Sequence, residues 1–577
     1  MQSESSRDLR SHSFSSTASS LNRTPRNSLE NETTVLPSFS HDKYLQEQLV
    51  EPQYGLSLGP SNEPDVASFF AGKSVFITGA TGFVGKVLVE KLLRSCSDVD
   101  KIFILVRPKR GVDPVTRIQK EFGTCELFRR VQRFNPDYVR KIIPIHGDMT
   151  KADLGISESD VRLIQDDVSI VFHVAATVRF DEKLKSALQL NVIAAKYLMK
   201  IARGMKNLQS YQHISTAYAH CDQSYIDEML YPTPANTDQL HSSIEWMTDD
   251  MVSKITPSIL NKKPNTYTFT KAMAEHMVIT EGVGLPINIV RPSIVGATWK
   301  EPFPGWIDNH HGASGLMIAY GKGMLPSVLG DVNATFDLVP VDVVVNNMIA
   351  AAWHTAVKRP IKVPIYNCVS STSNPLKFQP FASTVVNYYN KSPLKMKLRK
   401  PSGLRITKHD QIFNWSHFFH CKLPTTVFDR CLKLVGRKQR LSKMADLVSK
   451  SVYTLKYFTC NEWQWRTDNV TSLQNALPGK DKMAFSTELE SLNWTSYIND
   501  FCAGTKEYVL KENVSEYGTH KSHVTRSNIL RRFILASLVP LILWLTLKRT
   551  NFAKNLWFAV KLIVTYYTAV VYSKIPC

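Results

Sequence analysis

The stretch "KSVFITGATGFVGKVLVEKLLRS", residues 73–95, contains a strand pattern, a glycine-rich turn and a helix pattern, in that order. Residues 74–77 form a short, mostly apolar run that is typical of a buried strand. After the turn, apolar residues recur at the spacing of one helix face: Val84, Val87, Leu88 and Leu92. This order predicts the dinucleotide-binding corner of an α/β fold.

The three glycines of the turn each suit one role in binding a dinucleotide. Gly79 permits the tight turn, Gly82 lets the backbone approach a pyrophosphate, and Gly85 lets the helix pack closely on the strand. The start of the helix also offers free N–H groups and the positive end of its dipole to phosphates. The candidate cofactor-binding residues of this loop are Thr78, Gly79, Thr81, Gly82, Phe83, Val84 and Gly85.

The end of the next predicted strand, residues 101–106, indicates which dinucleotide binds. Proteins that bind the ribose of NAD place Asp or Glu at this point, whereas this strand is followed by Arg107, Lys109 and Arg110. Cations attract the 2′-phosphate of NADP, and a carboxylate would repel it. The sequence therefore favours NADPH, with Arg107 and Lys109 as candidate ligands of that phosphate.

Further strand patterns alternate with helix patterns and predict a Rossmann-type doubly wound parallel sheet. The stretch "IIPIHGDMT" contains a third strand and ends near Asp148, a candidate adenine contact. A fourth strand in "SIVFHVAATVRF" runs into Ala175, Ala176 and Thr177. We expect these three residues beside the nicotinamide.

The stretch "TYTFTK" contains Tyr267 and Lys271, which lie one turn apart on one face of a predicted helix. Alone, this spacing also occurs by chance on protein surfaces. A fifth strand, residues 211–214, ends at Ser215 and Thr216, and open α/β sheets bind ligands at the carboxyl ends of their strands. We therefore expect Thr216, or alternatively Ser215, to act with Tyr267 and Lys271 over the nicotinamide.

The glycine loop, the hydroxyl-bearing strand end and Tyr-x-x-x-Lys resemble the extended short-chain dehydrogenase/reductases. Three longer stretches resemble the fatty acyl-CoA reductases among them: "AATVRFDEKLKSALQLNV", "RPSIVGATWKEPFPGWIDNHHGASGLMIAYGKGML" and "DLVPVDVVVNNMIAAAW". The segment that begins "LKYFTCNEWQWRTDNV" is similar to the C-terminal domain of that family. The resemblance covers residues 69–512.

The resemblance implies an alcohol-forming reductase that converts a long-chain fatty acyl-CoA to the primary alcohol with two NADPH, through an aldehyde and with release of CoA. It implies that Thr216 and Tyr267 bind the thioester carbonyl, and that Tyr267 and Lys271 also contact the cofactor. Lys271 would hold the nicotinamide ribose and lower the pKa of Tyr267. Pro292 and Ser293, at the start of the second stretch, are further candidate cofactor contacts.

The sequence departs from the pattern of the extended reductases at one point. Asn191-Val192 is followed by Ile-Ala-Ala, where those reductases often have Gly-Thr. We expect this to alter a helix start slightly and to remove no catalytic group.

Composition and motifs divide the chain into five regions. The Ser-, Asn- and Arg-rich N-terminus has no sustained apolar period and cannot offset its chain entropy by burial. The predicted regions are a disordered tail (1–68), an NADPH-binding reductase domain with an interleaved substrate-binding part (69–365), a connecting region (366–442), a helical C-terminal domain (443–515) and membrane-associated segments (528–577).

The membrane prediction rests on two apolar runs, residues 533–547 and 556–572, the first of which has basic pairs at both ends. The net charge of +20 suits an anionic membrane face or a phosphate-rich cofactor, and no nucleic-acid-binding motif occurs. Nine scattered cysteines without a CxxC pair indicate free thiols and no metal site. We expect a cytosolic catalytic domain on the endoplasmic reticulum, with the peroxisomal membrane as the alternative; the oligomeric state is not indicated.

Other functions and another mechanism fit parts of the sequence. The enzyme could stop at the aldehyde or reduce another lipid carbonyl. A catalytically idle, membrane-tethered scaffold would be expected to have lost Tyr267 or Lys271, and both are present. An acyl-enzyme on Cys221, beside His220, is a possible route, but adjacent residues tend to point apart, so we expect direct hydride attack.

Overall fold

The computed structural model describes residues 63–107, 112–395, 397–398, 401, 403–434, 436, 440–512 and 560–561. Most of the predicted tail lies outside these ranges, and so does the candidate ligand Lys109. Both C-terminal apolar runs also lie outside them, except for residues 560–561. Within the described ranges, no helix combines the length and the hydrophobicity needed to cross a bilayer.

The centre of the protein is a seven-stranded sheet in the order β11-β7-β5-β4-β1-β2-β3, with all neighbouring strands parallel. From β1 the chain adds strands first on one side and then on the other, so the order reverses between β1 and β4. This reversal confirms the predicted doubly wound sheet and creates the crevice in which such sheets bind ligands. The strands are β1 (Ser74–Thr78), β2 (Ile102–Val106), β3 (Ile142–His146), β4 (Val168–His173), β5 (Ser210–Ile214), β7 (Ile287–Pro292) and β11 (Ile365–Cys368).

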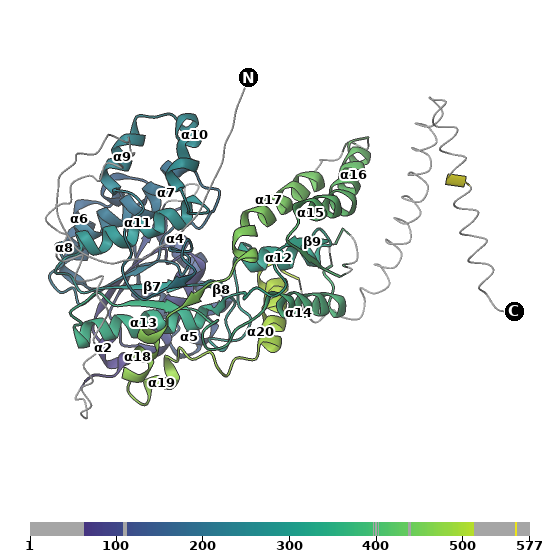
Figure 1. The fold of residues 1–577 in the computed structure, drawn as a ribbon. Coiled ribbons are helices and arrows are strands. Elements are labelled where there is room, and N and C mark those ends of the chain that lie inside the picture. The colour runs from purple at the N-terminus through teal and green to yellow at the C-terminus, as the bar shows by residue number, and fades with distance from the viewer. Residues whose placement is uncertain are drawn as a thin grey trace, which may run out of the picture.

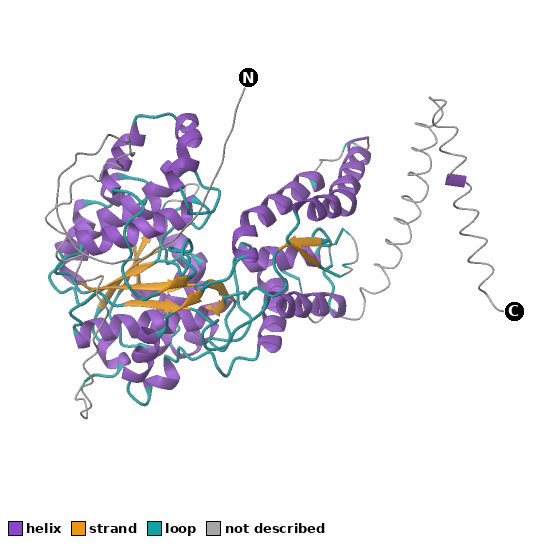
Figure 2. Cartoon of the chain, in the orientation of Figure 1, coloured by secondary structure: helices purple, strands orange, loops and turns teal. Residues whose placement is uncertain are grey.

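Helices cover both faces of the sheet and build a second lobe beside it (Figure 1, Figure 2). Within the described ranges, the α-helices are α2 (Val66–Phe70), α3 (Phe83–Ser95), α4 (Pro114–Ile118), α5 (Arg129–Phe134), α6 (Glu158–Asp167), α7 (Leu184–Leu188), α8 (Ala194–Arg203), α9 (Thr237–Glu245), α10 (Asp249–Leu260), α11 (Thr266–Glu281), α12 (Gly312–Gly321), α13 (Val341–Lys358), α14 (Phe378–Lys391), α15 (Asp410–His417), α16 (Leu423–Leu434), α17 (Leu441–Cys460), α18 (Asp468–Ala476), α19 (Asp481–Ala484) and α20 (Trp494–Gly504).

Short elements complete the fold. Three further pairs of parallel strands are β6 (Tyr225–Ile226) with β13 (Gln464–Trp465), β8 (Ile294–Gly296) with β10 (Leu338–Pro340), and β9 (Ser327–Leu329) with β12 (Arg405–Thr407). Tight 3-10 and π-helical turns are η1 (Gln119–Gly123), η2 (Glu126–Phe128), η3 (Tyr138–Lys141), η4 (Ala152–Gly155), η5 (Gln189–Ile193), η6 (Phe418–Lys422) and η7 (Thr505–Val509).

Alternate residues of β1 face opposite helix layers, as the two-residue period of a strand requires. Val75 and Ile77 lie in one apolar core with buried residues of α3 and α13. Phe76 lies in a second core with buried residues of α8 and α11. All five residues of β1 are buried because the sheet is covered on both sides.

The second lobe contains α12, α14, α15, α16, α17 and α20, which lie beyond the edge of the central sheet (Figure 1). The region 366–442, predicted to be a connection, supplies α14, α15 and α16 to this lobe and most of β11 to the sheet. The predicted C-terminal domain is also divided, since α17 and α20 lie in the lobe whereas α18 contacts β11 and α13. Long-range pairing, which local patterns do not show, decides these boundaries.

The N-terminal boundary also differs from the prediction, because α2 crosses the expected end of the tail at residue 68. The side chains of Val66 and Phe70 are fully buried. The backbone N–H of Val66 donates to Asp481 at 2.8 Å, and the indole of Trp353 donates to the Pro64 carbonyl at 2.9 Å. The last residues of the expected tail are therefore part of the folded core.

Candidate active site

The glycine loop between β1 and α3 has the close contacts that only glycine allows. Gly79 has a φ of +74°, and a Cβ atom there would lie 2.7 Å from the backbone nitrogen of Ala175. A Cβ at Gly85 would lie 2.3 Å from the Gly79 carbonyl oxygen. Gly82 is the N-cap of α3 and supplies no side-chain cap, so the first N–H groups of the helix remain available to an anion. This backbone cradle fits the pyrophosphate of a dinucleotide.

Two arginines lie beside the glycine loop: Arg107 directly follows β2, and Arg117, which the strand pattern does not indicate, lies in α4. The side chain of Arg107 is exposed, and its backbone carbonyl accepts a 2.6 Å hydrogen bond from Arg117. Arg117 also donates to the hydroxyl of Thr81 in the glycine loop at 3.2 Å, and its side chain is only 16% exposed. The signal that could have indicated Arg117 is the N-capped helix α4 directly after the basic strand end, with Asp113 as its cap.

The other predicted cofactor residues lie at the carboxyl ends of neighbouring strands. Asp148 follows β3, where its carboxylate accepts hydrogen bonds from the backbone N–H and the hydroxyl of Thr150 at 3.0 and 2.8 Å. The half-buried segment 175–177 follows β4, and the N–H of Ala175 donates to Thr78 at 3.2 Å. Pro292 ends β7, and Ser293 follows it with a buried hydroxyl that has no hydrogen-bond partner among the described residues.

Thr216, Tyr267 and Lys271 come together where β5 ends against α11. Asn265 caps α11 through its side chain, which accepts from the N–H of Thr268 at 2.9 Å and so fixes the first turn that carries Tyr267. The Nζ of Lys271 donates to the carbonyl oxygen of Ile214, the last residue of β5, at 2.6 Å. Burial lowers the pKa of Lys271 to about 8, although the nearby Glu275 carboxylate opposes this shift.

The hydroxyl of Thr216 lies beside Tyr267, donates to the Pro292 carbonyl at 3.4 Å and accepts from the N–H of Tyr218 at 3.3 Å. Burial raises the pKa of Tyr267 to about 12, and the hydrogen bond with Thr216 lowers it by less. The expectation that Lys271 lowers the pKa of Tyr267 is therefore not met here, because the ammonium is bonded to the Ile214 carbonyl instead. The hydroxyl of Ser215 is buried and has no partner among the described residues, so Ser215 stays the alternative to Thr216.

Comparison with known proteins places this arrangement in a family. A family model described as Male sterility protein matches residues 77–348 with its NAD-binding part, and a second model of the same description matches residues 420–512. Fatty acyl-CoA reductase 1 of Mus musculus is 44% identical over 495 residues, which are 86% of this chain and 96% of that protein. The chain belongs to the fatty acyl-CoA reductases. This confirms the predicted family.

A second named relative agrees with this family. Fatty acyl-CoA reductase 2 of Mus musculus is 40% identical over 494 residues, 85% of this chain and 95% of that protein. Among solved structures, the reductase domain of a nonribosomal peptide synthetase from Mycobacterium tuberculosis is 16% identical, with a TM-score of 0.49 over 75% of this chain and 92% of that chain. The NAD-binding model spans the glycine loop, Thr216 and α11, and therefore supports a nicotinamide cofactor for this fatty acyl-CoA reductase.

The surroundings of Cys221 in the reductase indicate a structural role and not a nucleophilic one. It is 2% exposed, and burial raises the pKa of its thiol to about 12. The adjacent His220 is held elsewhere, because its Nε2 lies 3.0 Å from the Glu275 carboxylate. Glu275 is in turn bound by the fully buried guanidinium of Arg291 at 2.7 and 2.9 Å. The geometry provides no base for a Cys221 thiolate.

Asn191 does not stand at a helix start, which corrects the sequence-based expectation. It lies in the π-helical turn η5, inside a helical run that continues from α7 into α8. Its side chain accepts from the N–H of Thr177 at 2.9 Å and donates to the hydroxyl of Thr270 at 2.9 Å. Asn191 thereby ties the end of β4 to α11, a link that no local pattern indicates.

An aromatic cluster, to which the C-terminal part of the reductase contributes Phe458 and Trp463, lies against Tyr267. The ring of Phe180 stacks on Tyr267 with centroids 5.6 Å apart, and Phe458 of α17 lies 5.1 Å from Phe180. Tyr218 contacts Phe458 and Trp463 edge-on at 5.1 and 5.4 Å. The sequence analysis missed this cluster because its members come from three distant segments.

Proposed function

We propose that this chain reduces a long-chain fatty acyl-CoA to the primary alcohol with NADPH and releases CoA. The observation that carries the proposal is the meeting of Thr216, Tyr267 and Lys271 at the carboxyl end of β5, which only β4 separates from β1 and the glycine loop. The apolar and aromatic surroundings of Tyr267 suit an acyl substrate, and a relative that the alignment covers to 96% of its length is named a fatty acyl-CoA reductase.

The preference for NADPH over NADH is supported by the charges at the end of β2. Arg107 and Arg117 lie beside the glycine loop, and their guanidinium groups suit a phosphate on the ribose. Bound there, NADPH would supply the hydride. The backbone N–H groups at the start of α3 would hold its pyrophosphate, and Asp148 and the segment 175–177 would border its adenine and nicotinamide ends.

The catalytic side chains can support both reductions without a covalent enzyme intermediate. Thr216 and Tyr267 donate hydrogen bonds to the thioester carbonyl and stabilise the oxyanion that forms when hydride arrives. Collapse of this oxyanion expels the CoA thiolate and leaves the aldehyde. After the second hydride transfer, Tyr267 gives its proton to the alkoxide. The alkoxide is a stronger base than the Tyr267 phenolate, because the pKa of the Tyr267 phenol is about 12.

Lys271 supports this chemistry by position and charge. Its buried ammonium is largely protonated at neutral pH, since its pKa lies at about 8. One face of α11 presents both Lys271 and Tyr267 to the crevice, so Lys271 can hold the nicotinamide ribose against Tyr267.

We also propose that this protein is attached to a membrane. The two apolar runs after residue 528 would anchor the protein in the endoplasmic reticulum with its catalytic domain in the cytosol, and the peroxisomal membrane is the alternative. A membrane lipid surface is a suitable environment for a long-chain alcohol product.

The test is a product analysis with the full chain in membranes. The protein is incubated with a mixture of acyl-CoA chain lengths and NADPH, and the lipids are identified by mass spectrometry, with Tyr267→Phe as the control. We expect primary alcohols and free CoA. Aldehyde as the end product would show that the enzyme stops there, and no turnover despite NADPH binding would support a catalytically idle scaffold.

A further inference from the structure

Large apolar side chains are exposed along the helices α15, η6, α16 and α17 of the second lobe. Of the 22 large hydrophobic residues that are exposed within the described ranges, nine lie between residues 412 and 453. We call this surface the aromatic face, and its most prominent members are Trp415, Phe418, Phe419, Leu423, Phe428 and Leu447. Such a concentration exceeds the scattered apolar residues of an ordinary surface and marks a binding surface.

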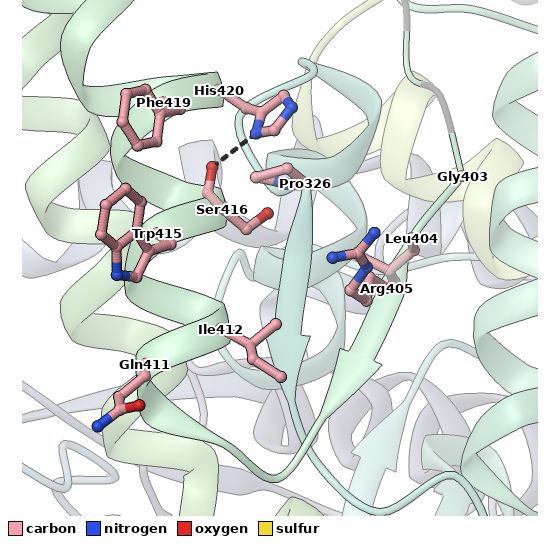
Figure 3. A pocket seen from close by; sticks show the side chains of 10 residues that line it. All are labelled: Pro326, Gly403, Leu404, Arg405, Gln411, Ile412, Trp415, Ser416, Phe419 and His420. Atoms are coloured by element: carbon pink, nitrogen blue, oxygen red, sulfur yellow. Dashed lines mark hydrogen bonds between the residues drawn. The ribbon is translucent and has the colours of Figure 1, made fainter.

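The aromatic face has a defined shape. Ile412, Trp415 and Phe419 follow one side of the continuous helix formed by α15 and η6, and the rings of Trp415 and Phe419 stack at 5.3 Å. They form one wall of a groove of about 890 Å³, whose opposite wall includes Arg405 of β12 and Leu404, which precedes it (Figure 3).

Charge identifies the class of partner. Residues 395–456 contain 15 Lys and Arg but three Asp and no Glu, a net charge of +12 out of +20 for the whole chain. Arg430, Lys433 and Lys443 are exposed and form no ion pair with another described residue. Apolar rings bordered by cations match an anionic bilayer surface, whereas a second copy of the same face would be repelled.

The described segment 440–512 ends at the same lobe. The carboxylate of Glu512 accepts hydrogen bonds from the backbone N–H of Lys395 at 3.0 and 3.2 Å. The apolar run 533–547 begins 21 residues later, within about 75 Å of Glu512 even if the chain were fully extended. The aromatic face therefore lies on the lobe from which the predicted membrane segments leave.

We propose that the aromatic face docks on the surface of an anionic membrane, as a second contact besides the C-terminal segments. Trp415 and Phe419 enter the boundary between headgroups and acyl chains, and the cations of α16 and α17 bind lipid phosphates.

The helix α17 connects this surface to the catalytic tyrosine. Leu447 on the aromatic face and Phe458 in the aromatic cluster are 11 residues apart on α17, or about 16 Å. Phe458 contacts Phe180, which stacks on Tyr267. Docking would hold the active site close to the bilayer. The advantage of this position rests on the proposed acyl-CoA substrate, whereas the docking itself does not depend on that substrate.

The test compares two exposed tryptophans on different parts of the protein. Trp415 is 66% exposed, and Trp246, which directly follows α9, is 70% exposed; α9 lies across the central sheet from the second lobe (Figure 1). In the full chain, a benzophenone amino acid replaces one of these two tryptophans, and the protein is incorporated into vesicles of phosphatidylcholine and phosphatidylserine. The vesicles are irradiated, and the adducts that form are identified by mass spectrometry. We expect lipid adducts at position 415 at least fivefold more often than at position 246.

The other possible outcomes either overturn the proposal or show whether charge contributes to the docking. Equal lipid labelling at both positions, crosslinks between two chains, or crosslinks to residues 533–572 would each overturn it. In the charge variant Lys433→Glu/Lys443→Glu, adducts at position 415 should fall severalfold, and an unchanged yield would rule out the electrostatic part. Labelling does not depend on turnover, so an inactive protein that is labelled at position 415 would contradict the proposed function and leave the docking intact.

Discussion

The hydroxyl of Tyr457 donates a 2.9 Å hydrogen bond to the carbonyl oxygen of Cys221, 236 residues earlier in the chain. The indole of Trp463 donates to the same oxygen at 2.9 Å, so both of its lone pairs are used. Because Cys221 lies five residues after Thr216, the C-terminal part of the chain fixes the segment that carries the catalytic hydroxyl. The C-terminal region is thus a structural part of the active site.

We expect Trp465→Phe to slow turnover through the same segment. The indole of Trp465 donates to the Ala217 carbonyl at 3.1 Å, and removing it leaves a buried acceptor unpaired beside Thr216, at a cost of roughly 1–3 kcal/mol. The value of kcat should fall about tenfold while the Kd for NADPH, from a fluorescence titration, stays the same. The control is Trp494→Phe, whose indole bonds to Asn374 away from the site. Equal losses in both variants would point to general destabilisation.

Tyr267→Phe should reduce alcohol formation on the order of 10²-fold or more, because the variant lacks the proton donor. Cys221→Ala should keep most of the activity, since the thiol is buried and largely protonated. Both variants are assayed with a long-chain acyl-CoA and, separately, with an aldehyde. If Cys221→Ala lost thioester reduction but kept aldehyde reduction, an acyl-enzyme would replace the direct mechanism.

Arg107→Asp and Arg117→Ala should each weaken NADPH binding, by a few kcal/mol for the charge reversal and less for the truncation. Arg117 also bonds to Thr81, so its loss should loosen the glycine loop as well. Binding of NADH is the internal control, because it lacks the 2′-phosphate and should change much less. An NADPH affinity that stays constant in titrations would remove the tested arginine from the phosphate site.

The pH dependence should follow Lys271 and not Tyr267. Burial lowers the pKa of Lys271 to about 8, so its ammonium is present below that pH and is lost as the pH rises through it. Tyr267, with a pKa of about 12, stays protonated throughout. We expect kcat/KM for NADPH to decrease above about pH 8. In Lys271→Arg the cation persists, and the decrease should disappear even if the overall rate is lower. Retention of the same alkaline limb would assign it to another group.

Truncation before Asn528 should release the protein from membranes washed with high salt and carbonate, and leave a folded domain that binds NADPH. The two apolar runs begin after this point. Sedimentation after washing and binding of NADPH by the supernatant are the measurements. Persistent sedimentation would place the anchor in an earlier segment.

Local patterns in the sequence determined the nucleotide-binding half of the fold. In β1, Gly79, Gly82, Gly85 and α3, the strand, turn and helix are neighbours in the chain, and their geometry depends on adjacent residues. The spacing of Tyr267 and Lys271 also belongs to a single helix turn. For these elements, hydrophobic period and glycine placement were sufficient.

Only the tertiary structure decided the relations between distant segments. It placed Thr216 beside Tyr267, brought Arg117 to the glycine loop, and packed Phe458 against Phe180, which stacks on the catalytic tyrosine. Neighbouring residues at a strand end differ in direction by the pleat, which composition does not reveal. Contacts across hundreds of residues leave no periodic signal in one sequence, because they depend on how the packed lobes meet.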